Sequence, residues 1–396
     1  MEEWQVFGTE LRKFRTRAGL SVRGLAGLLH YDPGALSRLE NGRRKPPADL
    51  VRKLDSVLGA DGVLEAVYDS VITDTAEADR STQLGLRETA ALAERRYIDR
   101  ALAEDLAELL SETRRLEDRV GSKLVLPVSL RQARISSKLA TEARGAARSE
   151  VVDSAAGWQQ FLGWLHANLG HHRAAVHNYR AALELATESG NRDMISTALS
   201  MRGHVAWMAG EIDCMVGLSR AAQRDARALS PTVLALAVQQ EGRGLAIAGD
   251  LDAMEAKLDQ AADLIARGDP NRPDAQYFYS DALIEMQRGL AYRLARQWSK
   301  ALESLEAGLS SFDPEMLTSE WATWYVAESA CALAGVGEPE LASQRALDAL
   351  QVGAATPGSR LIGFIRVLHR EMSAKWPMNT DVDVLGEALR QLPAGR

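Results

Sequence analysis

A helical pattern that recurs along the chain constrains the fold more than any other feature of the sequence. Four related windows carry glycine inside a helix-like apolar run, at residues 162–170, 202–210, 241–249 and 288–296. Their glycines are separated by 40, 39 and 47 residues and are Gly163, Gly203, Gly242 and Gly289. A side chain would hold two backbones apart, so we expect these glycines where the first helices of neighbouring repeats approach closely.

Each window continues, after a turn, into a second helical segment with small residues. These segments include Ala175–Tyr179–Ala182, Met215–Ser219–Ala222, Met254–Leu258–Ala261 and Ala301–Leu305–Gly308. The pattern predicts a repeated helical hairpin, with a fifth and more divergent copy at residues 324–350. Because each hairpin buries its apolar face only against its neighbours, the copies are expected to stack into a solenoid.

Composition agrees with an all-α protein of more than one domain. The chain has 396 residues, more than one hydrophobic core usually serves, with 46% apolar residues and only 6% aromatic ones. No stretch is long and apolar enough for a membrane span, and the first residues lack the order of a signal peptide, so we expect a cytoplasmic protein. Cys214 and Cys331, the two cysteines, are expected to be buried, reduced thiols.

Charge divides the chain into a basic head and an acidic body. Residues 1–59 contain 11 Lys and Arg against 7 Asp and Glu, a net charge of +4, whereas the remainder contains 36 against 47, a net of −11. The overall charge of −7 therefore hides a local attraction for phosphate at the head.

The head predicts four short helices between residues 7 and 59. Ser21 and Asp32 are residues of the type that caps helix N-termini, and Pro33 stands where a first helical position is expected. Two short helices joined by a tight turn and followed by a basic loop form the unit that places its second helix in the DNA major groove.

On these residues the head resembles the Cro and phage-repressor type of helix-turn-helix, the XRE family. The resemblance covers about residues 7–59 and is carried by Leu25–Ala26, by the run 36–42 and by the basic exit 43–46. It implies a buried ion pair between Arg15 and Glu40. It implies base reading by Arg38, with Gly34 and Ser37 on or near the same face, and phosphate contacts from Arg23, Asn41, Arg43, Arg44 and Lys45.

The head departs from the family pattern at two positions. Pro33 replaces a polar base-reading residue and Val22 replaces a phosphate-binding glutamine, so specificity would depend more on Arg38 and on DNA shape. The alternative is that Arg38 and the basic run are a solvated face of a domain that no longer binds DNA; the basic balance and the intact motif favour DNA binding.

Four domain assignments follow from these patterns. We expect a helix-turn-helix domain at 1–72, including an extra helix at 63–72, and a polar linker at 73–86. A helical hairpin at 87–150, built from segments 87–120 and 123–148, would lead into a repeat domain at 151–396.

The repeat domain resembles tetratricopeptide repeats, although its copies exceed that family's period of about 34 residues. The resemblance implies a superhelix whose concave wall is lined by first helices. The concave positions would hold Gln160, Trp164, Asn168, Ser200, His204, Trp207, Gln239, Arg243, Met286, Arg293, Tyr325 and Ser329. Aromatic, amide and arginine side chains in one groove suit a peptide or a small acidic ligand, although aromatic residues at helical spacing also serve as ordinary packing.

Other chemistry finds little support in the sequence. His166, His171, His172 and His177 lie close together but straddle a turn and lack accompanying cysteine or carboxylate ligands, which disfavours a metal site. No phosphate-binding glycine loop, nucleophile elbow or carboxylate pair is present, so neither a cofactor nor an enzymatic activity is expected.

The whole plan is similar to regulators of the Rgg and PlcR type and to actinobacterial regulators of the same design. It implies transcriptional control by a homodimer that binds a palindromic operator and a peptide, small-molecule or protein effector. The rival hypothesis is an adaptor whose array docks a partner protein while the head serves assembly.

Overall fold

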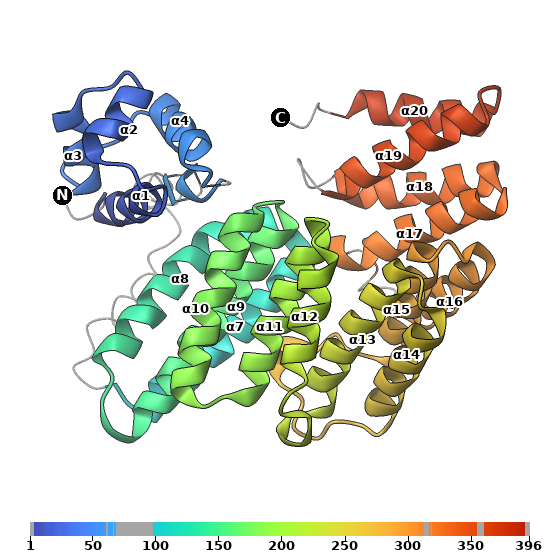
Figure 1. Ribbon diagram of the computed structural model, residues 1–396, viewed down its shortest axis with the longest axis horizontal. Coiled ribbons are helices and arrows are strands. Elements are labelled where there is room, and N and C mark those ends of the chain that lie inside the picture. Colours follow the sequence, from blue (N-terminus) through green and yellow to red (C-terminus); the bar gives the residue numbers. More distant parts are fainter. Residues whose placement is uncertain are drawn as a thin grey trace.

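The computed structural model describes residues 4–60, 62–65, 67–68, 98–312, 317, 319–354 and 360–392. Within these ranges the chain forms α-helices and short 3-10 helices, and no β-strand (Figure 1). The predicted all-α fold, a small helical head followed by a helical solenoid, is confirmed. None of the described helices is long and apolar enough to cross a membrane.

The head consists of four short helices around one core. They are α1 (Gln5–Arg17), α2 (Val22–Leu28), α3 (Pro33–Glu40) and α4 (Ala48–Leu58). Their apolar faces meet at fully buried side chains such as Phe7, Leu25, Leu36 and Leu54. Residues 63–65 and 67–68 are also helical, and the rest of the predicted helix at 63–72 lies outside the described residues.

Local capping fixes the turn between α2 and α3. The Ser21 hydroxyl accepts a hydrogen bond from the Gly24 amide at 3.0 Å, and the Asp32 carboxylate accepts one from the Ala35 amide at 2.6 Å. Pro33 occupies the first helical position, where a missing N–H costs nothing. All three capping predictions are confirmed, and together they hold α3 at a defined angle to α2.

The array begins with α7 (Arg100–Val120) and continues as antiparallel helical pairs in chain order. The further helices are α8 (Ser122–Glu142), α9 (Arg148–Asn168), α10 (His172–Ser189), α11 (Arg192–Met208), α12 (Ile212–Ala222), α13 (Pro231–Ala248), α14 (Leu251–Ala266), α15 (Asp281–Leu294), α16 (Trp298–Ser311), α17 (Glu320–Val336), α18 (Pro339–Ala354), α19 (Arg360–Lys375) and α20 (Thr380–Gln391). The last pair, α19 and α20, extends the array beyond the copies that the sequence pattern identified.

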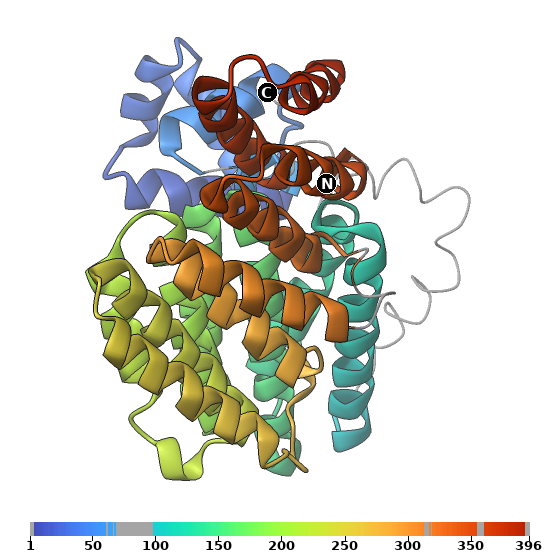
Figure 2. The same ribbon diagram turned by 90° about the vertical axis from the view of Figure 1, so that its right-hand side faces the viewer.

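The pairs wind into a superhelix that brings distant parts of the chain together. The head and α19–α20 lie at the same edge of the array in both views (Figures 1 and 2). The head rests on α10, where the Arg173 guanidinium donates to the Gly59 carbonyl at 3.1 Å and Ala174 joins the head's core. The predicted linker at 73–86 and residues 87–97 of the predicted hairpin lie outside the described residues.

The four repeated glycines serve a different contact from the expected one. A Cβ on any of them would meet the second helix of the same hairpin, and not the first helix of a neighbouring repeat. The residue sixteen positions later is each time among the nearest: Tyr179, Ser219, Leu258 and Leu305. The glycine therefore lets the two helices of one hairpin approach closely, which corrects the expectation about neighbouring first helices.

The expectation of buried cysteines is also wrong. Cys214 is exposed on α12, and Cys331 on α17 is half-buried. Their apolar sequence surroundings are misleading because in a solenoid one face of each helix remains at the surface.

Candidate functional site

The outer face of α3 presents the residue expected to read bases. The side chain of Arg38 is 54% exposed, and its guanidinium lies 3.8 Å from the carboxylate of Asp32, which is also exposed. Gly34 lies beside it, since a Cβ there would be 3.6 Å from the Arg38 guanidinium. Pro33 is also exposed and Ser37 is half-buried. Helix α3 lies at the outer edge of the head (Figure 1).

The expected phosphate-contacting residues border this face. Arg23, Arg43 and Arg44 are exposed, and Lys45 is exposed with its ammonium 5.8 Å from the centre of the Trp4 ring. Asn41 is exposed at the end of α3, and its side-chain oxygen accepts a hydrogen bond from Arg12 at 2.6 Å. All five residues are thus exposed, Arg23 on α2 and the other four directly after the last residue of α3.

Arg15 and Glu40 tie α1 to the end of α3. The Arg15 Nε lies 2.5 Å from Glu40 Oε1 and its Nη2 lies 2.9 Å from Oε2, so both carboxylate oxygens are engaged. A third bond reaches the Leu20 carbonyl at 2.7 Å. The Glu40 side chain is only 3% exposed, and its hydrogen bond raises the pKa of Arg15. The pair therefore fixes α3 against the rest of the head.

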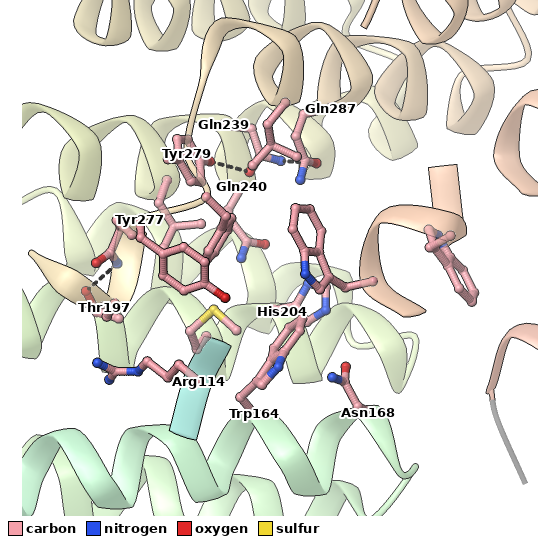
Figure 3. A pocket seen from close by; sticks show the side chains of 18 of the residues that line it. Arg114, Trp164, Asn168, Thr197, His204, Gln239, Gln240, Tyr277, Tyr279 and Gln287 are labelled. Carbon is pink, nitrogen blue, oxygen red and sulfur yellow. Dashed lines mark hydrogen bonds between the residues drawn. The ribbon is translucent and has the colours of Figure 1, made fainter. Parts of the chain in front are cut away.

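The second candidate site is a cavity of about 140 Å³ on the inner face of the array. The first helix of every pair contributes to its wall: α7, α9, α11, α13, α15, α17 and α19. Aromatic and amide side chains converge on it from several of these helices (Figure 3). Its volume is about ten times what a single water molecule needs.

Most of the expected groove residues line this cavity. They are Gln160, Trp164, Asn168, His204, Trp207, Gln239, Arg243 and Tyr325. The further concave positions Ser200, Met286 and Ser329 are fully buried between helices and do not reach it.

Arg293 corrects the expectation that two arginines hold the ligand. It is not among the residues that line the cavity, and its guanidinium lies 2.5 Å from the Glu328 carboxylate, which is fully buried. A buried carboxylate needs such a partner, so Arg293 is committed to the packing of α15 against α17.

Of the two arginines expected in the groove, Arg243 is the one that lines the cavity, and it is only 3% exposed. Its guanidinium stacks 4.6 Å from the centre of the Trp207 ring and donates to the Gln287 side-chain oxygen at 2.5 Å. A contact of 3.2 Å joins it to His204 Nδ1. Burial lowers the pKa of His204 well below its usual value, so the imidazole is neutral and accepts this hydrogen bond.

Residues 267–280 form a crossing segment that the sequence did not predict. It connects α14 to α15 and reaches α7, where Arg114 donates to the Asp274 carboxylate at 3.0 Å. The Tyr277 hydroxyl and, at 2.8 Å, the Trp321 indole both donate to the Asp118 carboxylate. Burial raises the pKa of Asp118. The segment thus covers one side of the groove, so that the groove becomes a cavity.

Several cavity residues were absent from the expected set, including Arg114, Asp118, Gln240, Tyr277, Gln287, Trp321, Trp324 and Arg360. One signal for the crossing segment was available. The step from Gly242 to Gly289 is 47 residues rather than 39 or 40, and the additional residues fall in this segment.

The histidines that invited a metal hypothesis lie at the junction of head and array. His166 is fully buried, and its Nδ1 lies 3.3 Å from Nδ1 of His171, which contacts Gly62 in the head. His177 faces charged residues of α1. These contacts pack the head against α9 and α10.

Comparison with known proteins adds two distant structures and one domain family. The chain is similar to BtubC (BKLC) from P. vanneervenii, with a TM-score of 0.42, 17% identity, and coverage of 59% of this chain and 92% of that one. It is also similar to Bacillus thuringiensis PlcR, solved with the peptide PapR7 and DNA, with a TM-score of 0.36, 12% identity, and coverage of 77% and 94%. Both scores lie below 0.5, so functional inference depends on this chain's own residues.

The sequence matches no curated protein. Residues 6–67 do match the helix-turn-helix domain family, and they contain α1 to α4 with the paired Arg15 and Glu40. Residues 6–67 are therefore a helix-turn-helix domain, and an array of helical hairpins follows it.

Proposed function

We propose that this protein is a sequence-specific transcriptional regulator whose array binds an effector and forms a homodimer. The observation that carries the proposal is the outer face of α3, where Arg38 is exposed and bordered by phosphate-binding residue types. A guanidinium can bond O6 and N7 of guanine together, and the neighbouring cations hold the register. The buried ion pair beneath this face supports the same function because it holds the recognition helix rigidly.

A homodimer follows from the size of the head. One small head buries too little DNA surface for strong specific binding, whereas two heads on half-sites one helical turn apart bury enough. We propose that the array supplies the dimer surface and that the operator is palindromic.

The cavity is the proposed effector site. Seven first helices contribute to its wall, so a ligand there lies among hairpins from both ends of the array. Small rotations between stacked hairpins add along a solenoid, and a ligand that favours one arrangement would change the position of the heads. The contact between Arg173 and Gly59 joins the head to α10, which pairs with the cavity helix α9.

The test is selection of bound fragments from genomic DNA with the purified full-length protein, followed by gel-shift titration over a range of salt. We expect one palindromic sequence to be enriched and bound at least about 1,000-fold more tightly than random DNA. Light scattering should report a dimer. Weak binding that is independent of sequence and fully suppressed by salt would instead support an adaptor.

A further inference from the structure

Arg243 differs from Arg114 and Arg293 in lacking an acidic partner. Arg114 pairs with Asp274 at 3.0 Å, and Arg293 pairs with Glu328 at 2.5 Å. Among the described residues, no carboxylate lies within ion-pairing distance of Arg243, whose contacts are the neutral groups of Trp207, His204 and Gln287. The Nε of Arg243 has no hydrogen-bond partner in the described part of the chain.

A buried charge without a counter-ion is strongly destabilising, so an unpaired guanidinium in a cavity wall indicates that an anion belongs there. Burial lowers the pKa of Arg243, and the charge of the Glu328 carboxylate opposes this shift, but Glu328 forms its ion pair with Arg293. Arg360 also lines the cavity, with its guanidinium 4.1 Å from the centre of the Trp324 ring. Arg243 and Arg360 therefore both bring a guanidinium to the cavity wall.

Arg243 calls for an anionic group in the ligand, and Gln240 calls for a hydrogen-bond donor. It lines the cavity with 2% exposure, and its Nε2 donates to the Ser200 carbonyl at 3.3 Å. A carbonyl only accepts hydrogen bonds, so this contact fixes the orientation of the amide and leaves Oε1 as an acceptor. No described group donates to Gln240 Oε1, nor to the corresponding oxygen of Gln276, another buried lining residue. A ligand with an N–H or O–H group would satisfy such an oxygen.

The two requirements lie within reach of one small molecule. Gln240 and Arg243 are three residues apart on α13, which places their Cβ atoms about 5–6 Å apart on one face of the helix. The remaining wall includes several aromatic side chains, Trp164, Trp321 and Phe278 among them. The crossing segment limits the length of any occupant, which disfavours an extended peptide.

We propose that the cavity binds a small aromatic carboxylate of one or two rings that also carries a hydrogen-bond donor. Its carboxylate pairs with Arg243, its donor bonds Gln240, and its ring lies among the aromatic side chains. The inference deepens the proposed effector role of the cavity and rests on it.

The test uses three probes that share one ring system and differ in charge: indole-3-acetate, indole-3-acetamide and tryptamine. Isothermal titration calorimetry on the full-length protein without DNA should show the acetate binding about tenfold or more tightly than the neutral acetamide, because only the acetate can form a charge-assisted hydrogen bond with the guanidinium. The cationic tryptamine should bind most weakly. Equal binding of acetate and acetamide, or binding of none of the probes at millimolar concentration, would overturn the inference.

Variants of Arg243 test the same contact. Arg243→Gln should abolish the preference for acetate over acetamide, whereas Arg243→Lys should retain part of it because the charge remains. Arg288→Gln is the matched control, since Arg288 lies on α15, is paired with Asp259 and does not line the cavity. A preference for acetate that survives in Arg243→Gln would contradict the assignment. If that variant does not fold, the ranking of the three probes on the unaltered protein decides.

Separate measurements distinguish this inference from the proposed function. If the probes rank as expected but DNA affinity does not change on binding, the cavity is a carboxylate site and its effector role is wrong. If specific DNA binding is found but acetate and acetamide bind equally, the regulator remains and the ligand class is wrong.

Discussion

The outer face of α3 and the wall of the array's cavity use the same residue type in opposite ways. Arg38 in the head is more than half exposed and makes only a 3.8 Å contact with a solvated carboxylate. Arg243 in the array is almost completely buried, stacked on Trp207 and hydrogen-bonded to Gln287. The first side chain takes no part in the packing of its domain, whereas the second is part of its domain's interior.

The difference indicates how each region can be altered without losing the fold. An exposed residue costs little to remove, so its substitution should change recognition alone. A buried residue contributes to packing as well as to binding, so its substitution has to be judged against ligands of different charge. The following predictions test whether exposure separates recognition from stability in this way.

The largest effect is expected where the head itself contains a buried charge. Arg15→Ala should lower the thermodynamic stability of the head by about 3–5 kcal/mol, because it leaves the Glu40 carboxylate buried without its bidentate partner. Arg12→Ala removes a guanidinium that lies 3.6 Å from the same carboxylate but is 52% exposed, and should cost under about 1 kcal/mol. Hydrogen exchange of the amides in α3 measures both. Similar losses for the two variants would show that burial does not decide the effect.

Arg38→Ala should leave the head folded and lower the affinity for the selected operator by about 1–3 kcal/mol, with relaxed preference at one base pair in each half-site. Lys45→Ala should lower the affinity for all DNA sequences alike and reduce the salt dependence of binding. Gel-shift titrations on operator and random DNA check both variants. Equal losses on the two DNAs for Arg38→Ala would exclude base reading by this residue.

The head was more predictable from sequence than the cavity, for a physical reason. Its caps, helices and the residues Arg15, Arg38 and Glu40 belong to one run of about fifty residues whose contacts are mostly local. The cavity joins α7 to α17 through contacts such as Asp118 with Trp321, which are 203 residues apart in sequence. The repeat register placed Trp164, His204 and Arg243 correctly on the inner wall. It could not show that Arg293 is paired or that a connecting segment crosses the groove.

Two glycines of the array differ in the space that a side chain would find, and their substitution tests packing without a change of charge. Gly289→Ala should destabilise the array by about 1–3 kcal/mol, because the new Cβ would lie 2.5 Å from Leu305 Cγ and 2.8 Å from the Leu305 backbone nitrogen. Gly217→Ala on α12 is the control, since a Cβ there meets nothing within 4 Å and alanine favours the helix by about 0.5–1 kcal/mol. Denaturant titrations should show opposite signs. Stabilisation by both substitutions would mean that the close approach of α15 and α16 is not required.

The smallest expected effect is the pH dependence of stability that His166 gives to the array and not to the head. His166 is fully buried in the array, and burial, followed by the nearby charges of His171 and His177, lowers its pKa to about 3. In the unfolded chain a histidine titrates near 6.5, so the unfolded state binds more protons between about pH 6.5 and 3. Stability from the neutral imidazole is therefore complete above about pH 6.5 and is lost as the pH falls, by at most about 1.4 kcal/mol per pH unit.

Thermal unfolding of the protein at pH 7.5 and 5.5, compared with His166→Gln, isolates this contribution, and the variant should lose less stability on acidification. Hydrogen exchange should localise the difference to α9, away from the head, whose one histidine, His30, is exposed in the turn between α2 and α3. The same acid sensitivity in protein and variant would exclude His166 as its source.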